Sequence, residues 1–560
     1  MIYYDIVVEL PKKKRIKKTK NKSYVEQIIN RKGINFDKDK VVTVGVLIDE
    51  HNMHPNSKYF ELNNTVINIS NEENDEKNKD LFNNQLSIGA NLLLKSISKA
   101  ERLTKSINES IPGYYDLILS LIEYYMVTKK SESQLYKYYA QEHYTNLNYI
   151  PSESELSKFF NEKLSRDKIS NFLETWMKER LNNFCFNNRV DIDFDSTNFN
   201  ISSSSIKQAE YGKAKVDEGL PQVNVAYFLE RESGLPIYYD IYYGSIIDMT
   251  HCKTAIDKLK KIKKDINASF ITDKGYYSLD NIKHFIDNDF NFMSMGKDSA
   301  YFTEVIKKYD ISYITKAKNR INDTVYGIKL TNQKTFSLSS LKFNVYLFYN
   351  QAPVAWYMSE EIDKVEDIAR TLIGKKDKNG YIINTYGKMI HIKKNDDNII
   401  ISAEVNYDRL DKIREKTGYF YIVSNEDLSC EEVLLSYRHR DNVEKQFKYG
   451  KSGCDLVKTY SQNEHSLEAK RLLSFIASIL RASINIKTKG YKLLYSTETS
   501  QTILEELNKI KVEKLGGRYI LRYALTAKQK QILSYFDLTQ KDVVKLVEDI
   551  NQILNLKDTE

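Results

Sequence analysis

Hydrophobic and polar positions alternate strictly in the stretch RVDIDFD, residues 189–195. The apolar residues Val190, Ile192 and Phe194 fall on one face of an extended chain, and three aspartates fall on the other. Those aspartates are Asp191, Asp193 and Asp195. The pattern predicts a half-buried strand with a row of carboxylates along its polar face.

The next hundred residues predict a defined order of elements. VNVAYFLE (223–230) and GLPIYYDIYY (234–243) read as two strands joined by a turn, and MTHCKTAIDKLKKIKK (249–264) as a helix. ASFITD (268–273) is a short apolar strand, and a helix with Ser278 as its N-cap separates it from the strand FNFMSM. Three strands in hairpin succession, then helix, strand, helix and strand, is the RNase H-like arrangement.

Changes in the hydrophobic pattern divide the 560 residues into several parts. The fold class that we expect is α/β, with a core interrupted by an insertion. Residues 297–425 contain many short strand candidates, and a compact domain would not hold so long a structureless loop. The expected parts are an N-terminal basic DNA-binding region (1–80), a helical region (81–185), the first half of an RNase H-like catalytic core (186–296), a β-rich insertion (297–425), the second half of the core (426–485) and a C-terminal helical region (486–560). Trp176 lies on an amphipathic helix of the second part and is expected in its core.

Charge and composition narrow the class of protein. No run of about 18 apolar residues predicts a membrane span, and four widely spaced cysteines suggest a reduced, cytoplasmic protein without structural zinc. The net charge is +8, and residues 12–22 hold eight Lys or Arg and no acid. Such a run can neutralise DNA phosphates. A solvated tail or a basic strand on a small domain would show the same sequence pattern. The candidate DNA-binding residues are Lys12, Lys13, Lys14, Arg15, Lys17 and Lys18.

A second charged pattern lies at residues 437–451. Tyr437, Arg440, Glu444 and Lys451 are spaced by three, four and seven residues, so all four share one face of a helix. One carboxylate between two cations and a phenol suits a site for metal and phosphate better than a solvated face.

The predicted fold brings three carboxylates together. Asp195 lies near the exit of the first strand, Asp273 at the carboxyl end of a parallel neighbour, and Glu444 on the helix after the insertion. Three converging carboxylates need a cation, and oxygen ligands favour Mg²⁺ or Mn²⁺ over zinc. Taken alone, an Asp at a strand end is more often a helix or turn cap than a metal ligand, and a Glu on a helix is more often solvated. Asp193 shares the polar face of the first strand, but Asp195 lies nearer its exit.

These residues resemble the DDE transposases of bacterial insertion sequences, in the group marked by a Tyr-x2-Arg-x3-Glu-x6-Lys (YREK) motif. The motif matches fully from Tyr437 to Lys451, FDSTNFN resembles the first Asp segment, and ITDKGYYS resembles the second. The resemblance covers about residues 1–485.

The resemblance implies a function and a set of site residues. Asp195, Asp273 and Glu444 would hold two Mg²⁺ ions, with Mn²⁺ as a substitute, for cleavage of terminal inverted repeats and strand transfer into target DNA. Tyr437, Arg440 and Lys451 would grip phosphates, and Trp356 would stack on a flipped base. The partners would be double-stranded DNA and a second copy of the chain in a synaptic homodimer, with no membrane and no small-molecule substrate. The place of action would be the bacterial cytoplasm, at the nucleoid.

Three other interpretations stay open from the sequence. The first is a catalytically inactive or domesticated protein that binds transposon ends without cutting them. The second is an RNase H-like DNA nuclease without strand transfer. The third is a scaffold whose acids are only caps, which does not account for three acids and two cations at consistent positions.

Overall fold

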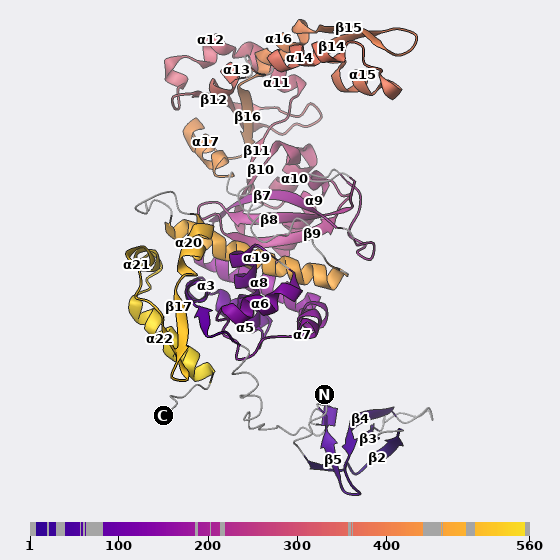
Figure 1. Ribbon diagram of the computed structural model, residues 1–560. Coiled ribbons are helices and arrows are strands. Elements are labelled where there is room, and N and C mark those ends of the chain that lie inside the picture. The colour runs from indigo at the N-terminus through magenta and orange to yellow at the C-terminus, as the bar shows by residue number, and fades with distance from the viewer. Residues whose placement is uncertain are drawn as a thin grey trace. The chain divides into compact units, whose positions relative to one another are not determined.

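The computed structural model divides into two units, Met1–Lys77 and Asn78–Glu560 (Figure 1). The structure describes residues 7–19, 22–29, 40–56, 58–59, 62, 82–130, 132–184, 189–201, 203–212, 219–356, 360, 362–440, 461, 463–488 and 499–554. Within them, no helix is long and apolar enough to cross a membrane.

The N-terminal unit is an antiparallel sheet with the strand order β1-β5-β4-β3-β2. Its strands are β1 (Val8–Glu9), β2 (Lys14–Lys18), β3 (Ser23–Ile29), β4 (Lys40–Leu47) and β5 (Asn52–Pro55). Val25, Val44 and Met53 are fully buried and form a small core of their own. The basic run of the sequence therefore includes a strand of a small domain, one of the forms it was expected to take.

The N-terminal part of the second unit is mostly helical, and one of its helices is almost entirely buried. These helices are α3 (Gly89–Ala100), α4 (Leu103–Ser110), α5 (Tyr115–Thr128), α6 (Ser133–Glu142), α7 (Glu153–Lys158) and α8 (Arg166–Phe184). Ten consecutive residues of α5, 117–126, are buried, and this helix packs against α19 (Glu464–Thr488). Trp176 is fully buried, as expected, and its indole N–H donates to the Pro236 carbonyl oxygen at 3.0 Å.

The C-terminal segment joins this helical region through a sheet. Its elements are α20 (Ser500–Leu507), β17 (Lys511–Leu515), β18 (Arg518–Leu521), α21 (Ala527–Ser534) and α22 (Gln540–Ile553). β17 pairs with both β18 and the distant β6 (Gln85–Ser87). A purely helical C-terminus was expected. The hairpin differs from that expectation, and its turn at Gly516 and Gly517, both at positive φ, is a local sequence signal for a hairpin. Only the pairing of β17 with β6, more than 400 residues away, lies outside any local pattern.

An eight-stranded mixed sheet forms the centre of the second unit, in the order β12-β13-β16-β11-β10-β7-β8-β9. The first elements to join it are β7 (Arg189–Asn200), β8 (Gln222–Glu230), β9 (Pro236–Tyr243), α9 (Asp248–Ile262), β10 (Asn267–Thr272), α10 (Leu279–Asp287) and β11 (Asn291–Met295). β7, β8 and β9 are antiparallel neighbours, whereas β10 runs parallel to both β7 and β11. This is the element order expected from the sequence, and Ser278 caps α10 by accepting from the Asn281 N–H.

The segment 297–425, expected as a β-rich insertion, contains both strands and helices. Its strands β12 (Val325–Gln333), β13 (Phe343–Asn350) and β16 (Tyr419–Ser424) extend the central sheet beyond β11. The segment also contains α11 (Ala300–Lys308), α12 (Ile311–Ile314), α13 (Ala352–Trp356), α14 (Ile362–Leu372), α15 (Tyr381–Tyr386), α16 (Tyr407–Lys416) and the hairpin β14 (Ile390–Lys394) with β15 (Ile400–Val405). A small core between α14, α16 and this hairpin sets part of the segment apart.

One face of the central sheet is covered by two helices with the aspartate strand β7 between them. α17 (Cys430–Arg438) packs on the side of β10, where Val433 and Leu434 share a core cluster with Ile271. α19 packs on the side of β8, where the Phe475 ring lies 6.1 Å from that of Tyr227. Ile271 pairs with Asp193 and Tyr227 with Asp195, and paired residues share a face of a sheet. The polar face of β7 therefore lies between α17 and α19.

We expect Glu123 to make the stability of the second unit depend on pH. This carboxyl group is buried on α5 and accepts hydrogen bonds from the Asn91 amide at 2.8 Å and the Tyr139 hydroxyl at 2.9 Å. Burial raises the pKa of Glu123 to about 7. The folded state thus holds the proton more tightly than the unfolded state, and this group's contribution is fully present below the unfolded pKa. The free energy of unfolding should fall by roughly 3 kcal/mol between pH 4.5 and 7 and then level off.

Glu123→Gln should remove this dependence and stabilise the chain at pH 8, as measured by urea unfolding. Glu109→Gln on α4 changes an exposed carboxylate and serves as the control. An unchanged pH profile in Glu123→Gln would contradict the assignment.

Candidate functional site

The register of two parallel strands places Asp195 and Asp273 side by side. The last paired residues of β7 and β10 are Asp193 and Ile271, and each acid lies two residues beyond them. Asp273 follows the end of β10 and begins the short 3₁₀ helix η2 (Lys274–Tyr276), where its carboxylate accepts from the Lys274 N–H at 2.6 Å. Two acids 78 residues apart in the sequence thus meet where β10 ends beside β7.

One guanidinium nitrogen faces both carboxylates. Arg440 Nη1 lies 3.1 Å from Asp195 Oδ2 and 3.8 Å from Asp273 Oδ2. The Tyr437 hydroxyl donates to Asp273 Oδ1 at 3.3 Å, and burial raises the pKa of this phenol. The Arg440 guanidinium also lies 5.7 Å from the centre of the Tyr437 ring. Residues expected to grip a phosphate therefore contact the carboxylates themselves.

Two residues that the sequence did not single out hold Asp195 in place. The Ser196 N–H donates to Asp195 Oδ1 at 2.8 Å. The Tyr276 hydroxyl lies 2.7 Å from Ser196 Oγ and 3.4 Å from Asp195 Oδ1. Tyr276 is buried, which raises its pKa well above the usual value and keeps the hydroxyl protonated as a donor. The signal that could have found it is its position three residues after Asp273.

Asp193 lies on the same face of β7, two residues before Asp195, and is more deeply buried. Its side chain is fully buried and forms no hydrogen bond with any residue that the structure describes. Arg231 Nε lies 3.7 Å from Asp193 Oδ1. Burial raises the pKa of Asp193 to about 7, while Arg231 and Arg440 oppose the rise. Asp195, and not Asp193, is the acid of β7 that lies within 4.0 Å of the same Arg440 nitrogen as Asp273.

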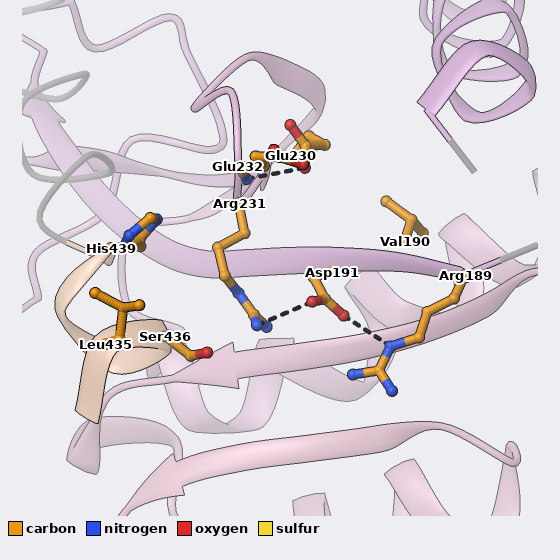
Figure 2. A pocket seen from close by; sticks show the side chains of 9 residues that line it. All are labelled: Arg189, Val190, Asp191, Glu230, Arg231, Glu232, Leu435, Ser436 and His439. Atoms are coloured by element: carbon orange, nitrogen blue, oxygen red, sulfur yellow. Dashed lines mark hydrogen bonds and ion pairs between the residues drawn. The ribbon is translucent and has the colours of Figure 1, made fainter. Parts of the chain in front are cut away.

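A cavity of about 330 Å³ lies beside this cluster, between the start of β7, the β8–β9 turn and the end of α17 (Figure 2). It is lined by Arg189, Val190, Asp191, Glu230, Arg231, Glu232, Leu435, Ser436 and His439. Figure 2 shows both arginines turned toward Asp191, with ion pairs of 2.9 Å from Arg189 and 3.0 Å from Arg231. Both guanidinium groups face the Asp191 carboxylate, so the positive charge at this cavity is partly balanced.

The donor set fits a hard divalent cation. Oxygen atoms of Asp195 and Asp273 already converge on one positive nitrogen, and carboxylate oxygens are the ligands that Mg²⁺ and Mn²⁺ prefer. Among the described residues, no group of three His, Cys, Asp or Glu side chains could hold a metal ion. Glu444, the third expected ligand, lies outside the described residues, as does Lys451.

The remaining candidates lie elsewhere. Trp356 is the last residue of α13, and its side chain is outside what the structure describes. Lys12 and Lys13 precede β2, and the other four basic candidates lie on β2 itself, all of them exposed. These six residues belong to the N-terminal unit and not to the unit that contains the carboxylates.

Comparisons with known proteins identify the part of the chain that carries the site. Residues 187–480, more than half of the chain, match the family model described as "Transposase DDE domain". A solved structure titled "Cryo-EM structure of piggyBac transposase synaptic complex with hairpin DNA" matches at 9% identity and a TM-score of 0.35 over 86% of this chain and 85% of that one. At this identity and TM-score, the match indicates no shared function. No curated protein matches the chain.

We expect Arg440 to compete with a divalent cation for the two carboxylates. Arg440→Gln removes the positive charge between them, so Mn²⁺ should bind the DNA-free chain about tenfold more tightly, as measured by calorimetry or electron paramagnetic resonance. Arg438→Gln makes the same change at an exposed position on α17 and should leave the affinity unchanged. Equal or weaker Mn²⁺ binding by Arg440→Gln would show that the guanidinium does not occupy the cation position.

Proposed function

This chain belongs to the transposase DDE domain family, and on that basis we propose that it is the transposase of a bacterial insertion sequence. It would bind the terminal inverted repeats of its element, cleave the DNA there and join the freed end to target DNA. The full match from Tyr437 to Lys451 supports the YREK group within the family. Such a protein would work as a homodimer across two DNA ends, at the bacterial nucleoid.

One observation carries the proposal. Asp195 and Asp273 lie at matching positions beyond the paired ends of two parallel strands and face a single cationic nitrogen. The antiparallel β7–β8–β9 meander continued by parallel β10 and β11 supports an RNase H-like core. The proposed catalytic and metal-binding residues are Asp195, Asp273 and Glu444.

The chain's own residues would prepare the site for phosphodiester cleavage. Two bound Mg²⁺ or Mn²⁺ ions would activate the attacking hydroxyl and stabilise the leaving oxygen. Ser196 and Tyr276 fix the orientation of Asp195, while the capping bond to the Lys274 N–H fixes that of Asp273. Arg440 can donate two parallel hydrogen bonds to a phosphate, and Tyr437 and Lys451 would add single contacts. Trp356 is proposed to stack on an extruded base near the cut.

Strand transfer separates this function from the simpler alternatives. In the first step, water would attack the phosphorus at the element's end and release a 3′-hydroxyl. That hydroxyl would then attack a second phosphodiester, so that each step breaks one P–O bond and forms another. A nuclease would stop after the first step, and an inactive end-binding protein would perform neither. Cleaved and joined products, scored separately in a plasmid assay, therefore distinguish all three.

We expect Asp195→Asn and Asp273→Asn each to lower cleavage of end DNA at least about a thousandfold, because each removes a cation ligand. DNA binding measured by gel shift should stay within a few-fold of the wild type. Chelation of divalent ions should also stop cleavage, and added Mn²⁺ should restore it in the wild type only.

Asp280→Asn is the matched control, because Asp280 is an exposed acid on α10 whose nearest cation, Lys253, lies 3.6 Å away. It should cleave at the wild-type rate. Cleavage by either active-site variant at the wild-type rate would overturn the assignment of that acid.

A further inference from the structure

Strand β2 lies at the free edge of the N-terminal sheet. It pairs with β3 on one side, and the strand order ends there, so its other edge has no strand partner among the described residues. All five residues of β2, KRIKK, are exposed, and so are the flanking residues Lys12, Lys13 and Thr19. Even Ile16, which pairs with the buried Val25, keeps 40% of its surface exposed.

Cations project from both faces of this strand. Residues two apart share a face, so Lys14 and Lys18 lie on one face and Arg15 and Lys17 on the other. The register agrees, because Ile16 pairs with the core residue Val25 whereas Lys17 pairs with Tyr24. A basic patch on the surface of a sheet would instead place its cations on a single face.

The positive charge of β2 is not compensated locally. None of its four cations forms a salt bridge within 4.0 Å with any residue that the structure describes. Glu26 pairs with Arg15 in the register, but its side chain is buried and lies beyond that distance. The strand therefore presents four unneutralised charges to a partner.

We propose that β2 enters the major groove of duplex DNA edge-on, a mode of binding that rests on the transposase function proposed above. Sheets pack about 10 Å apart, which is the thickness of one sheet with its side chains, and the major groove is about 12 Å wide. In this arrangement Lys14 and Lys18 face one phosphate backbone, and Arg15 and Lys17 face the other. The free edge then turns its N–H and C=O groups toward the bases.

Another role for these residues makes a different prediction. Lysines on an edge strand keep two sheets from pairing edge to edge. If that were their only role, neutral substitutions would cause self-association and leave the affinity for DNA and its salt dependence unchanged.

The test compares the two faces of β2 in the full-length chain. One variant combines Lys14→Gln with Lys18→Gln, the other combines Arg15→Gln with Lys17→Gln, and a third carries all four changes. The probe is mixed-sequence duplex DNA, and the readout is the slope of log K against log salt concentration. Lys541→Gln with Lys545→Gln removes two exposed charges from α22 and is the control.

Each double variant should reduce the magnitude of the slope by about 2, and the fourfold variant should reduce it by about 4. Each phosphate contact contributes about 0.9 to that magnitude. A change confined to one face would indicate contact with a single backbone and overturn the groove proposal. Unchanged slopes, or the same change in the α22 control, would also overturn it.

The result of this test can be distinguished from the result of the cleavage test of the proposed function. Cleavage at low salt depends on Asp195 and Asp273, and none of the β2 variants alters those residues. If the slopes stay unchanged while Asp195→Asn abolishes cleavage, the groove proposal fails and the transposase proposal stands. If Asp195→Asn and Asp273→Asn cleave normally while both β2 faces change the slope, the transposase proposal fails and β2 is still a groove-binding strand.

Discussion

Electrostatic repulsion between Asp195 and Asp273 is the constraint on which the site depends. The parallel register of β7 and β10 fixes the positions of the two acids, each two residues beyond the last pair of that register. β7 continues beside β8 to Asn200, whereas β10 ends just before Asp273. Two carboxylates held this close need a positive charge between them. In the DNA-free chain Arg440 supplies it, at 3.1 Å from one acid and 3.8 Å from the other. The same geometry suits a divalent cation, so Arg440 and a metal ion would compete for one position.

The packing of the sheet explains why this charged cluster is accessible at all. α17 covers the sheet on the side of β10 and α19 covers it on the side of β8, which leaves the polar face of β7 between them. Deeper on that face, Asp193 is buried with a raised pKa, whereas Asp195 keeps 14% of its side chain exposed. Burial thus distinguishes two neighbouring acids of one strand, since Asp193 is enclosed and Asp195 is partly exposed.

Much of the core could be predicted from the sequence, because its signals are local. The alternation of RVDIDFD indicated β7, and the order of the following elements indicated which strands are neighbours, which in turn brought Asp195 close to Asp273. What could not be predicted depends on distant pairing or on side-chain direction. β12 and β13 extend the central sheet through β16, and β17 pairs with β6, contacts that no local pattern encodes. Spacing predicted that Tyr437 and Arg440 share a helical face, but α17 ends at Arg438 and Arg440 lies in the turn after it. Spacing also could not show that Arg440 contacts the carboxylates. The positioning role of Tyr276 depends on packing against β7 and was missed for the same reason.

The most direct measurement of the central claim is anomalous scattering from Mn²⁺ in crystals of the full-length chain. We expect a peak about 2 Å from carboxylate oxygens of both Asp195 and Asp273, with the Arg440 guanidinium displaced from its position between them. A Mn²⁺ peak elsewhere in the chain, or an Arg440 guanidinium that stays between the two carboxylates at saturating Mn²⁺, would contradict it.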